Sequence, residues 1–149
     1  MDIWTEQLQK RHLPILESWL GRSAGALTPN DLPKEVNQLS SWFDQRWGSD
    51  FLISVYETPV GVAGLRDNEF YLFLGEVGYN LVRTATYATL RILDQAFTIF
   101  DSITVRVDKN RHEYLSALNT MGFRQLSEEN GLVRLSVQKT EFQSRKYLF

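Results

Sequence analysis

The chain of 149 residues contains no cysteine and only two histidines, His12 and His112. The absence of cysteine excludes disulfide scaffolds, thiolate zinc sites and cysteine nucleophiles. Two histidines are too few for a histidine-rich metal centre, so we expect no bound metal. Any chemistry in this chain must therefore use other groups.

The sequence also lacks a surplus of positive charge and lacks long apolar runs. Its 16 Lys and Arg residues face 18 Asp and Glu residues, a net charge of −2, which disfavours a general nucleic-acid binder. No apolar run approaches the length of a membrane span, and Met1–Glu6 lacks the basic and then apolar order of a signal peptide. We therefore expect a cytoplasmic protein without nucleic-acid or membrane partners.

The remaining composition is that of an ordinary globular protein. Hydrophobic residues make up 43% of the chain and charged residues 23%, which argues against disorder. The length favours a single domain spanning residues 1–149. The loop-like stretch Gly21–Asn30 joins two helical patterns and is too short to separate domains.

The two helical patterns follow a short predicted strand, Ile3–Leu8. The first pattern presents a face of three leucines: Leu13, Leu16 and Leu20. Gly21 is its expected end. The second presents four apolar residues at helical spacing: Val36, Leu39, Phe43 and Trp47. We expect Asp31 to cap this helix and Gly48 to end it, which predicts core positions for Phe43 and Trp47.

The period then changes to that of strands. Phe51–Tyr56 and Val60–Leu65 predict a hairpin, with Thr58-Pro59 as its turn. Phe70–Tyr79 is rich in aromatic and aliphatic residues and predicts a third strand. Three successive strands in this order favour an antiparallel arrangement.

The second half of the chain alternates helices and strands. The clearest helix carries one apolar stripe: Ala85, Ala88, Ile92, Ala96 and Phe100. A strand at Ile103–Val107 and a helix at Tyr114–Met121, closed by Gly122, follow. Phe123–Leu126 and Leu132–Val137 are the last predicted strands, joined by a Glu-Asn-Gly turn.

The predicted order is β-α-α-β-β-β-α-β-α-β-β. This order is typical of an α+β fold with a central, mostly antiparallel sheet flanked by helices. It contains one clear strand–helix–strand crossover, so it is not a doubly wound order.

Four sequence fragments lie on these predicted elements in a fixed order: Gly61–Asp67, Gly75–Leu81, Ala85–Ala88, and Val107–Asn110 followed by Met121–Phe123. They are similar, in this order, to four elements of one enzyme family: its third strand, its fourth strand, the start of its cofactor-binding helix, and its second cofactor element with a closing Gly-Phe. Together they resemble the GNAT family of acyl-CoA N-acyltransferases, in the branch that modifies ribosomal-protein N-termini (the RimJ/RimL type). The resemblance covers most of the chain.

The resemblance implies a splay between the fourth and fifth strands, where backbone groups pair with the pantetheine arm of acetyl-CoA. It also implies that the following helix receives the pyrophosphate at its N-terminus. The residues expected to contact this co-substrate are Val77, Gly78, Tyr79, Arg83, Thr84, Ala85, Thr86 and Asn110. The implied reaction is direct transfer of an acetyl group to a primary amine, of a protein N-terminus or a small molecule, in a ternary complex.

Two residues are candidates for proton transfer. Glu76 lies near the expected thioester and is the candidate base for the amine, or else an exposed residue or an ion-pair partner of Arg66. Leu118 occupies the place where many family members have a tyrosine acid. Water, or Tyr114 one helical turn earlier, is then the proton source for the departing thiolate.

Several candidate site residues have a plainer interpretation. Arg83 and its threonines form either a phosphate cradle or an ordinary helix start. Asn110 either bonds the pantetheine arm or caps a helix, and Arg111 competes for that family position. His112 is predicted to be a surface residue.

Other aromatic and terminal residues suggest contacts with partners. Trp42 lies off its helical stripe and, with Tyr56, is a candidate for an acceptor pocket. The tail Lys139–Phe149 is predicted to be an edge strand or a partner contact, and a homodimer is the default assembly.

The segment Asn80–Ala85 departs from the family's Gln/Arg-x-x-Gly-x-Gly/Ala pattern, with Arg83 at the first glycine and a short loop before it. This departure motivates a second hypothesis, a catalytically inactive GNAT-like binding or regulatory module. A third is an unrelated α+β interaction domain, in which the fourth and fifth strands stay paired.

Overall fold

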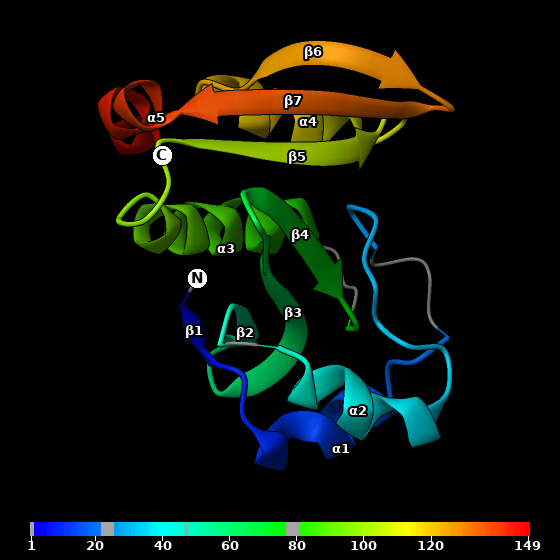
Figure 1. Cartoon of the computed structure of the whole chain (residues 1–149). Helices are drawn as coiled ribbons and strands as arrows, with labels where there is room; N and C mark the ends of the chain where they lie inside the picture. The colour runs from blue at the N-terminus through cyan, green and yellow to red at the C-terminus, as the bar shows by residue number, and fades with distance from the viewer. Residues whose placement is uncertain (1, 22–25, 47, 77–80) are drawn as a thin grey trace.

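The computed structural model describes residues 2–21, 26–46, 48–76 and 81–149 (Figure 1). Its strands are β1 (Ile3–Gln7), β2 (Asp50–Val55), β3 (Thr58–Arg66), β4 (Glu69–Leu74), β5 (Ser102–Asp108), β6 (Arg124–Glu129) and β7 (Leu132–Gln138). Its α-helices are α1 (Leu13–Glu17), α2 (Leu39–Asp44), α3 (Leu81–Ala96), α4 (His112–Thr120) and α5 (Lys139–Arg145). The predicted order of elements is confirmed, with α5 added at the end.

The described strands form one seven-stranded sheet in the order β1-β2-β3-β4-β5-β7-β6. Every neighbouring pair is antiparallel except β4 and β5, which are parallel. The α+β class with a mostly antiparallel sheet is therefore confirmed.

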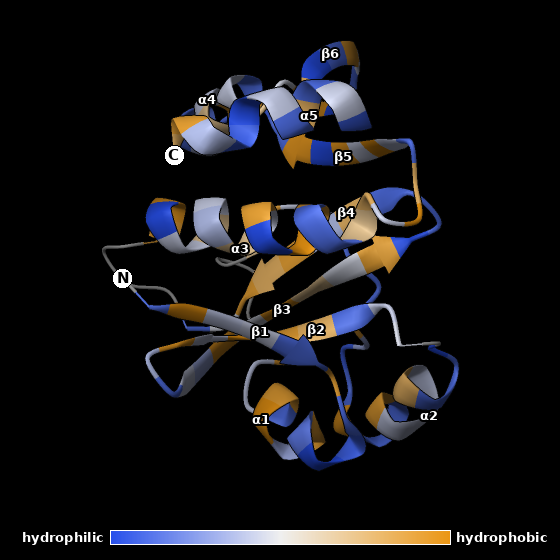
Figure 2. Cartoon of the chain, turned by 90° about the vertical axis from the view of Figure 1, so that its left-hand side faces the viewer, coloured by the Kyte–Doolittle hydropathy of each residue, from blue (hydrophilic) through white to orange (hydrophobic). Residues whose placement is uncertain are grey.

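Helices cover both faces of this sheet and enclose two apolar cores. Helices α1 and α2 lie on one face and α3 on the other (Figure 2). Side chains of β4 alternate between the cores: Phe70, Leu72 and Leu74 join the α3 side, whereas Tyr71 and Phe73 join the α1–α2 side. This near-continuous apolar strand is thus buried on both faces.

The two predicted hairpins form, but one of their turns was misplaced. Asn130 and Gly131 both have positive φ, as the tight β6–β7 turn requires. In the β2–β3 hairpin the turn lies at Tyr56 and Glu57, and Thr58-Pro59 begins β3 instead of forming the turn. Pro59 pairs with Ser54 next to a register shift of the ladder, and proline within sheets is found at such irregularities.

The second helix differs from its prediction in length, cap and buried face. The α-helix begins only at Leu39, and its buried residues are Leu39 and Trp42. Trp42 therefore packs in the core rather than lining an open pocket, while Phe43 is half-buried. Asp31 is not its cap, because its carboxylate binds the Arg46 guanidinium at 2.7 and 2.8 Å. Trp47 lies outside the described residues.

The C-terminal tail forms a helix and not an edge strand. Phe142 of α5 is fully buried and packs against Phe97 with ring centroids 5.1 Å apart. Glu141 and Arg145 form an ion pair at helical spacing, 2.7 Å between Oε1 and Nε. One buried aromatic residue and one such pair favour a helix over an alternating strand.

Strand β4 ends at Leu74, five residues before the predicted end at Tyr79. The N–H groups of Gly75 and Glu76 both donate to the carbonyl oxygen of Val60, at 2.8 and 3.1 Å. This double contact ends the ladder, so Glu76 lies beyond the strand rather than within it. Among the described helices, none is long and apolar enough to cross a membrane.

Candidate functional site

Strands β4 and β5 separate soon after they meet. Among the described residues they pair only at Glu69–Thr104 and Phe70–Val105. Strand β4 then continues to Leu74 with no β5 partner, and Figure 1 shows the two strands running apart. The described parts of the two strands therefore diverge, as the resemblance implies, whereas Gly78, at which the interaction-domain hypothesis required pairing with Val107, lies outside the described residues.

The residues of β4 that face the splay are identified by their hydrogen bonds. The carbonyl oxygen of Asn68 accepts the N–H of Thr104 at 2.9 Å, so even-numbered backbone groups point toward β5. Leu72 is four residues farther along, and its N–H and C=O point to the same edge. The resemblance places the pantetheine arm farther along the chain, at Val77, Gly78 and Tyr79, which lie outside the described residues.

Another part of the chain occupies this edge at Leu72. The Leu72 N–H donates to Thr28 Oγ1 at 2.9 Å, and its carbonyl accepts the N–H of Leu27 at 3.2 Å. Ala26 forms an antiparallel bridge with Phe73. We call these three consecutive residues, 26–28, the strap. Sequence reasoning treated them as loop, because three residues are too few to show a period.

Helix α3 lies beside the splay, and the structure describes it from Leu81, four residues before Ala85, where the resemblance places its start. The Arg83 guanidinium is exposed and lies 5.8 Å from the Tyr87 ring centroid. A helix N-terminus favours an anion, and the exposed Arg83 guanidinium lies close to the first described residue of this helix.

The other predicted cradle residues are less available. Ala85, Thr84 and Thr86 are buried, and the Thr86 hydroxyl donates to the carbonyl oxygen of Val82 at 2.7 Å. The predicted contacts at Val77, Gly78 and Tyr79 lie outside the described residues. Their roles, like the phosphate contact of Arg83, stay predictions.

Glu76 is held at the end of β4 by a tryptophan. Its Oε1 accepts the indole N–H of Trp19 at 3.0 Å, while its side chain is exposed. The Trp19 ring is buried and packs on Gly75, where a Cβ atom would lie 2.1 Å from the ring. This contact fixes the position of the Glu76 carboxylate.

The alternative pairing of Glu76 with Arg66 is wrong. The Arg66 guanidinium instead binds Asp50 at 3.1 Å and Asp31 at 3.3 Å. Asp50 also accepts the Tyr71 hydroxyl. Arg66 is therefore part of an ion cluster on the α1–α2 side of the sheet.

Tyr114 lies in the core between α3 and α4. Its hydroxyl is 2.8 Å from Thr89 Oγ1, which itself donates to the Ala85 carbonyl oxygen at 2.7 Å. Burial raises the pKa of the Tyr114 hydroxyl. These contacts favour a structural link between the helices and do not support the predicted role as an acid.

Asn110 lies in the exposed connection between β5 and α4. Its N–H donates to Asp108 Oδ1 at 2.8 Å, and the cap position of α4 is Arg111. The interpretation of Asn110 as the helix cap is therefore wrong, and its contact with pantetheine stays a prediction. His112 is exposed, as predicted.

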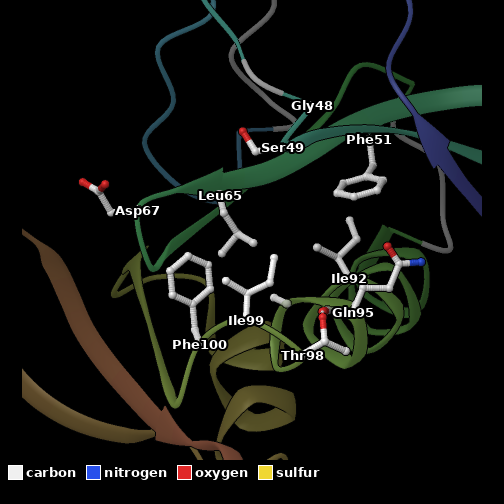
Figure 3. Close-up of a pocket in the computed structure, with 11 residues that line it drawn as sticks. Gly48, Ser49, Phe51, Leu65, Asp67, Ile92, Gln95, Thr98, Ile99 and Phe100 are labelled. Atoms are coloured by element: carbon white, nitrogen blue, oxygen red, sulfur yellow. The ribbon is translucent and has the colours of Figure 1, made fainter.

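One cavity borders the end of β4, and another borders the C-terminal end of α3. One, of about 340 Å³, lies beside the end of β4 and has walls of Trp19, Leu32 and Phe73, with Lys34 among its lining residues. The other, of about 450 Å³, lies between β2, β3 and the C-terminal end of α3, where Phe51, Leu65 and Ile99 point toward one another (Figure 3). Only the first adjoins the Glu76–Trp19 contact.

The described residues contain no cluster of three or more acidic, histidine or cysteine side chains suited to a metal. The chain's own groups around the splay are a carboxylate, a guanidinium and backbone amides. These groups bind anions and amides and can accept a proton.

Comparison with protein-family models and with curated proteins finds no match. Solved structures are similar over nearly the whole chain. A spermidine N-acetyltransferase from Vibrio cholerae, in complex with CoA and spermine, is 13% identical, with a TM-score of 0.74, over 95% of this chain and 98% of that one. FdhC, a nucleotide-linked sugar GNAT, is 14% identical, with a TM-score of 0.71, over 98% and 92%.

A domain from Methanocaldococcus jannaschii is 17% identical, with a TM-score of 0.67, over 92% of this chain and 98% of that one. At these identities the similarity establishes the fold and nothing finer. The chain has the GNAT fold, whereas its predicted place in the RimJ/RimL branch gains no support.

Proposed function

We propose that this chain is an acyl-CoA-dependent N-acyltransferase that passes an acetyl group from acetyl-CoA to a primary amine. The observation that carries the proposal is the splay of β4 and β5 directly beside the start of α3. A splayed strand edge suits an extended, amide-bearing arm, and a helix start suits a pyrophosphate. Arg83 would add a charge-assisted contact to that anion.

Proton transfer in this proposal rests on Glu76. The amine nitrogen forms a bond to the thioester carbonyl carbon, the C–S bond breaks, and the amine proton passes to the Glu76 carboxylate, directly or through water. Water protonates the departing thiolate, since Tyr114 is buried and bonded to Thr89. Positioning by the splay supplies much of the rate in such a reaction.

The acceptor body would occupy the 340 Å³ cavity beside Trp19. Its walls are largely apolar, and the charged residue among its described lining is Lys34, a cation. A cation at this position repels a second amine. We therefore propose a compact monoamine as acceptor and not a polyamine.

The test begins with calorimetric titration of acetyl-CoA and continues with amine-dependent release of CoA. A thiol reagent reports that release without background, because the protein has no cysteine. The amines compared are 2-phenylethylamine and spermidine. We expect saturable acetyl-CoA binding and faster turnover of 2-phenylethylamine.

The variant Glu76→Gln tests the proposed base alone. Glutamine lacks the basic carboxylate but keeps an oxygen that can accept the Trp19 indole N–H. General bases contribute roughly 100-fold or more, so kcat should fall by about that factor with the Kd for acetyl-CoA unchanged. The matched control is Glu57→Gln, at an exposed turn. Equal kcat values for the two variants would contradict the role of Glu76.

A catalytically inactive binding module is the second candidate. The departure of Asn80–Ala85 from the family's pyrophosphate pattern favours it, with Arg83 at the first glycine. If the chain does not bind acetyl-CoA at millimolar concentration, this candidate is favoured and the proposed acyltransferase activity is refuted. The homodimer and the cytoplasmic location stay predictions.

A further inference from the structure

Strand β1 forms one edge of the sheet, and one side of its backbone is open. Among the described strands it pairs only with β2. The Leu8 N–H donates to the Asp50 carbonyl oxygen at 2.9 Å, so even-numbered backbone groups along β1 point toward β2. The N–H and C=O groups of Ile3, Thr5 and Gln7 therefore point away from the sheet. Figure 2 looks onto this edge, where β1 lies in front of β2.

Two exposed aromatic side chains lie beside this edge. Ile3 belongs to the core on the α3 side, so its neighbour Trp4 faces the other way and is 59% exposed. Tyr56, at the β2–β3 turn, is 63% exposed. The Trp4 indole N–H donates to Asp2 Oδ2 at 2.9 Å, and the Tyr56 N–H donates to the Asp2 carbonyl oxygen at 2.8 Å. Both aromatic residues are thus held next to one carboxylate.

The conformation of Tyr56 is unfavourable for a tyrosine. Its φ is 51°, in the left-handed region that glycine or asparagine adopts more readily. A large aromatic ring that is mostly exposed gains little from burial at this position. Folding stability alone therefore gives no reason for a tyrosine in this turn, whereas contact with a partner does.

Trp4 and Tyr56 line a surface depression of about 620 Å³ that is acidic. Asp2 and Glu6 are among its lining residues, and no lysine or arginine is among those described. The ion pair of Glu6 with Arg11, at 3.5 Å, joins two side chains that are more than half exposed, so it contributes little. A cation placed over these rings would be attracted by the aromatic faces and by the carboxylates.

We propose that the outer edge of β1 docks an extended, basic segment of a partner protein. The segment adds a strand through the N–H and C=O groups of Thr5, and its lysine or arginine side chains lie over Trp4 and Tyr56. The charge favours this occupant over a second copy of the chain, because a second β1 would bring the same carboxylates to one interface. This inference does not depend on acetyl transfer.

Peptides added to the intact chain test the proposal. The probe is a blocked, fluorescent peptide of alternating threonine and arginine, with 5 residues to match β1, and its anisotropy reports binding. One matched peptide carries glutamate in place of arginine, and another is N-methylated on the amides that would face β1. We expect saturable binding of the arginine peptide that weakens with salt, and no binding of the glutamate peptide. Each hydrogen bond removed by N-methylation should lower affinity by about 2- to 10-fold.

Thr5→Pro removes the outward N–H from the protein itself. Proline is tolerated on an edge strand where the N–H faces solvent, so pairing with β2 should persist. The matched control is Thr5→Val, which keeps the N–H. We expect the proline variant to bind the arginine peptide about 2- to 10-fold more weakly than the valine variant. Trp4→Ala should lower the affinity by about 2- to 5-fold, whereas Leu126→Ala, on the opposite edge strand β6, should leave it unchanged.

Equal affinities of the plain and N-methylated peptides would overturn the added strand, and this comparison holds even if Thr5→Pro does not fold. Equal affinities of the arginine and glutamate peptides would overturn the basic partner. A dimer that Thr5→Pro dissociates in sedimentation, with no peptide binding, would show that a second copy occupies the edge and that the proposal is wrong. None of these results depends on acetyl-CoA, so the proposed function is tested separately.

Discussion

The contact between Trp19 and Gly75 leads to a sharp prediction about the end of β4. A Cβ atom on residue 75 would lie 2.1–2.5 Å from three carbons of the Trp19 indole, where ordinary contacts are 3.4 Å or longer. Gly75→Ala must therefore push the ring by about 1 Å. The ring is buried, so it cannot turn into solvent.

The loss of stability follows from placing an additional methyl group in a core that is already densely packed. Such insertions destabilise by about 1–3 kcal/mol, and we expect Gly75→Ala to lie in the upper half of that range, because the clash is with a rigid ring. The shift also separates the indole N–H from Glu76 Oε1, now 3.0 Å apart. The same variant should therefore impair any turnover that depends on Glu76.

Urea unfolding of four proteins tests this reasoning: wild type, Gly75→Ala, Trp19→Phe and the double variant. The smaller phenylalanine ring makes room for the new methyl group, so the double variant should be more stable than the sum of the two single changes allows. A coupling of about 1 kcal/mol is expected for residues in contact. A neutral Gly75→Ala, or strictly additive effects, would refute the packing argument.

Two further predictions concern buried titratable groups. Burial and Arg11 lower the pKa of His12, whose Nδ1 accepts the Gln9 N–H, so the folded state favours the neutral ring. The unfolded chain then binds more protons, so the free energy of unfolding should fall as the pH drops below about 6.5. In urea unfolding measured from pH 7.5 to 5.5, the midpoint should decrease less for His12→Asn than for wild type. Equal decreases in the two proteins would contradict this. Tyr114→Phe removes the bond to Thr89 and should cost about 1 kcal/mol, with kcat changed less than about threefold; a loss of 100-fold would restore Tyr114 as the acid.

Much of the fold was predictable because its signals are local. Alternation at Ile103, Val105 and Val107 places buried side chains on β5, and the Asn130-Gly131 pair suits a turn with two positive φ angles. The apolar face of α3 was equally clear from the spacing of its residues. In each case the pattern is set by neighbouring residues, so no distant contact was needed to interpret it.

The errors arose where distant residues decide the outcome. Strand β4 stops at Leu74 because Val60, on β3, accepts two N–H groups in succession. Asp31 does not cap α2, because its carboxylate forms ion pairs with the guanidinium groups of Arg46 and Arg66. Neither partner is visible in the local sequence.

The candidate site shows the same division. Glu76 and Arg83 were found from their places in an ordered set of motifs, and the splay was implied by the family resemblance. The Trp19–Glu76 bond joins residues 57 positions apart, and the strap joins residues 44 positions apart. Sequence periodicity carries no information about such pairs.

The sequence by itself therefore determined the fold class, the absence of cysteine chemistry and the small set of side chains available for proton transfer. The tertiary structure alone decided where β4 ends, what holds Glu76 and which segment occupies the open edge at Leu72. The physical reason is that backbone hydrogen bonds at a strand edge go to whichever group lies there. Only the folded chain brings Thr28 to that place.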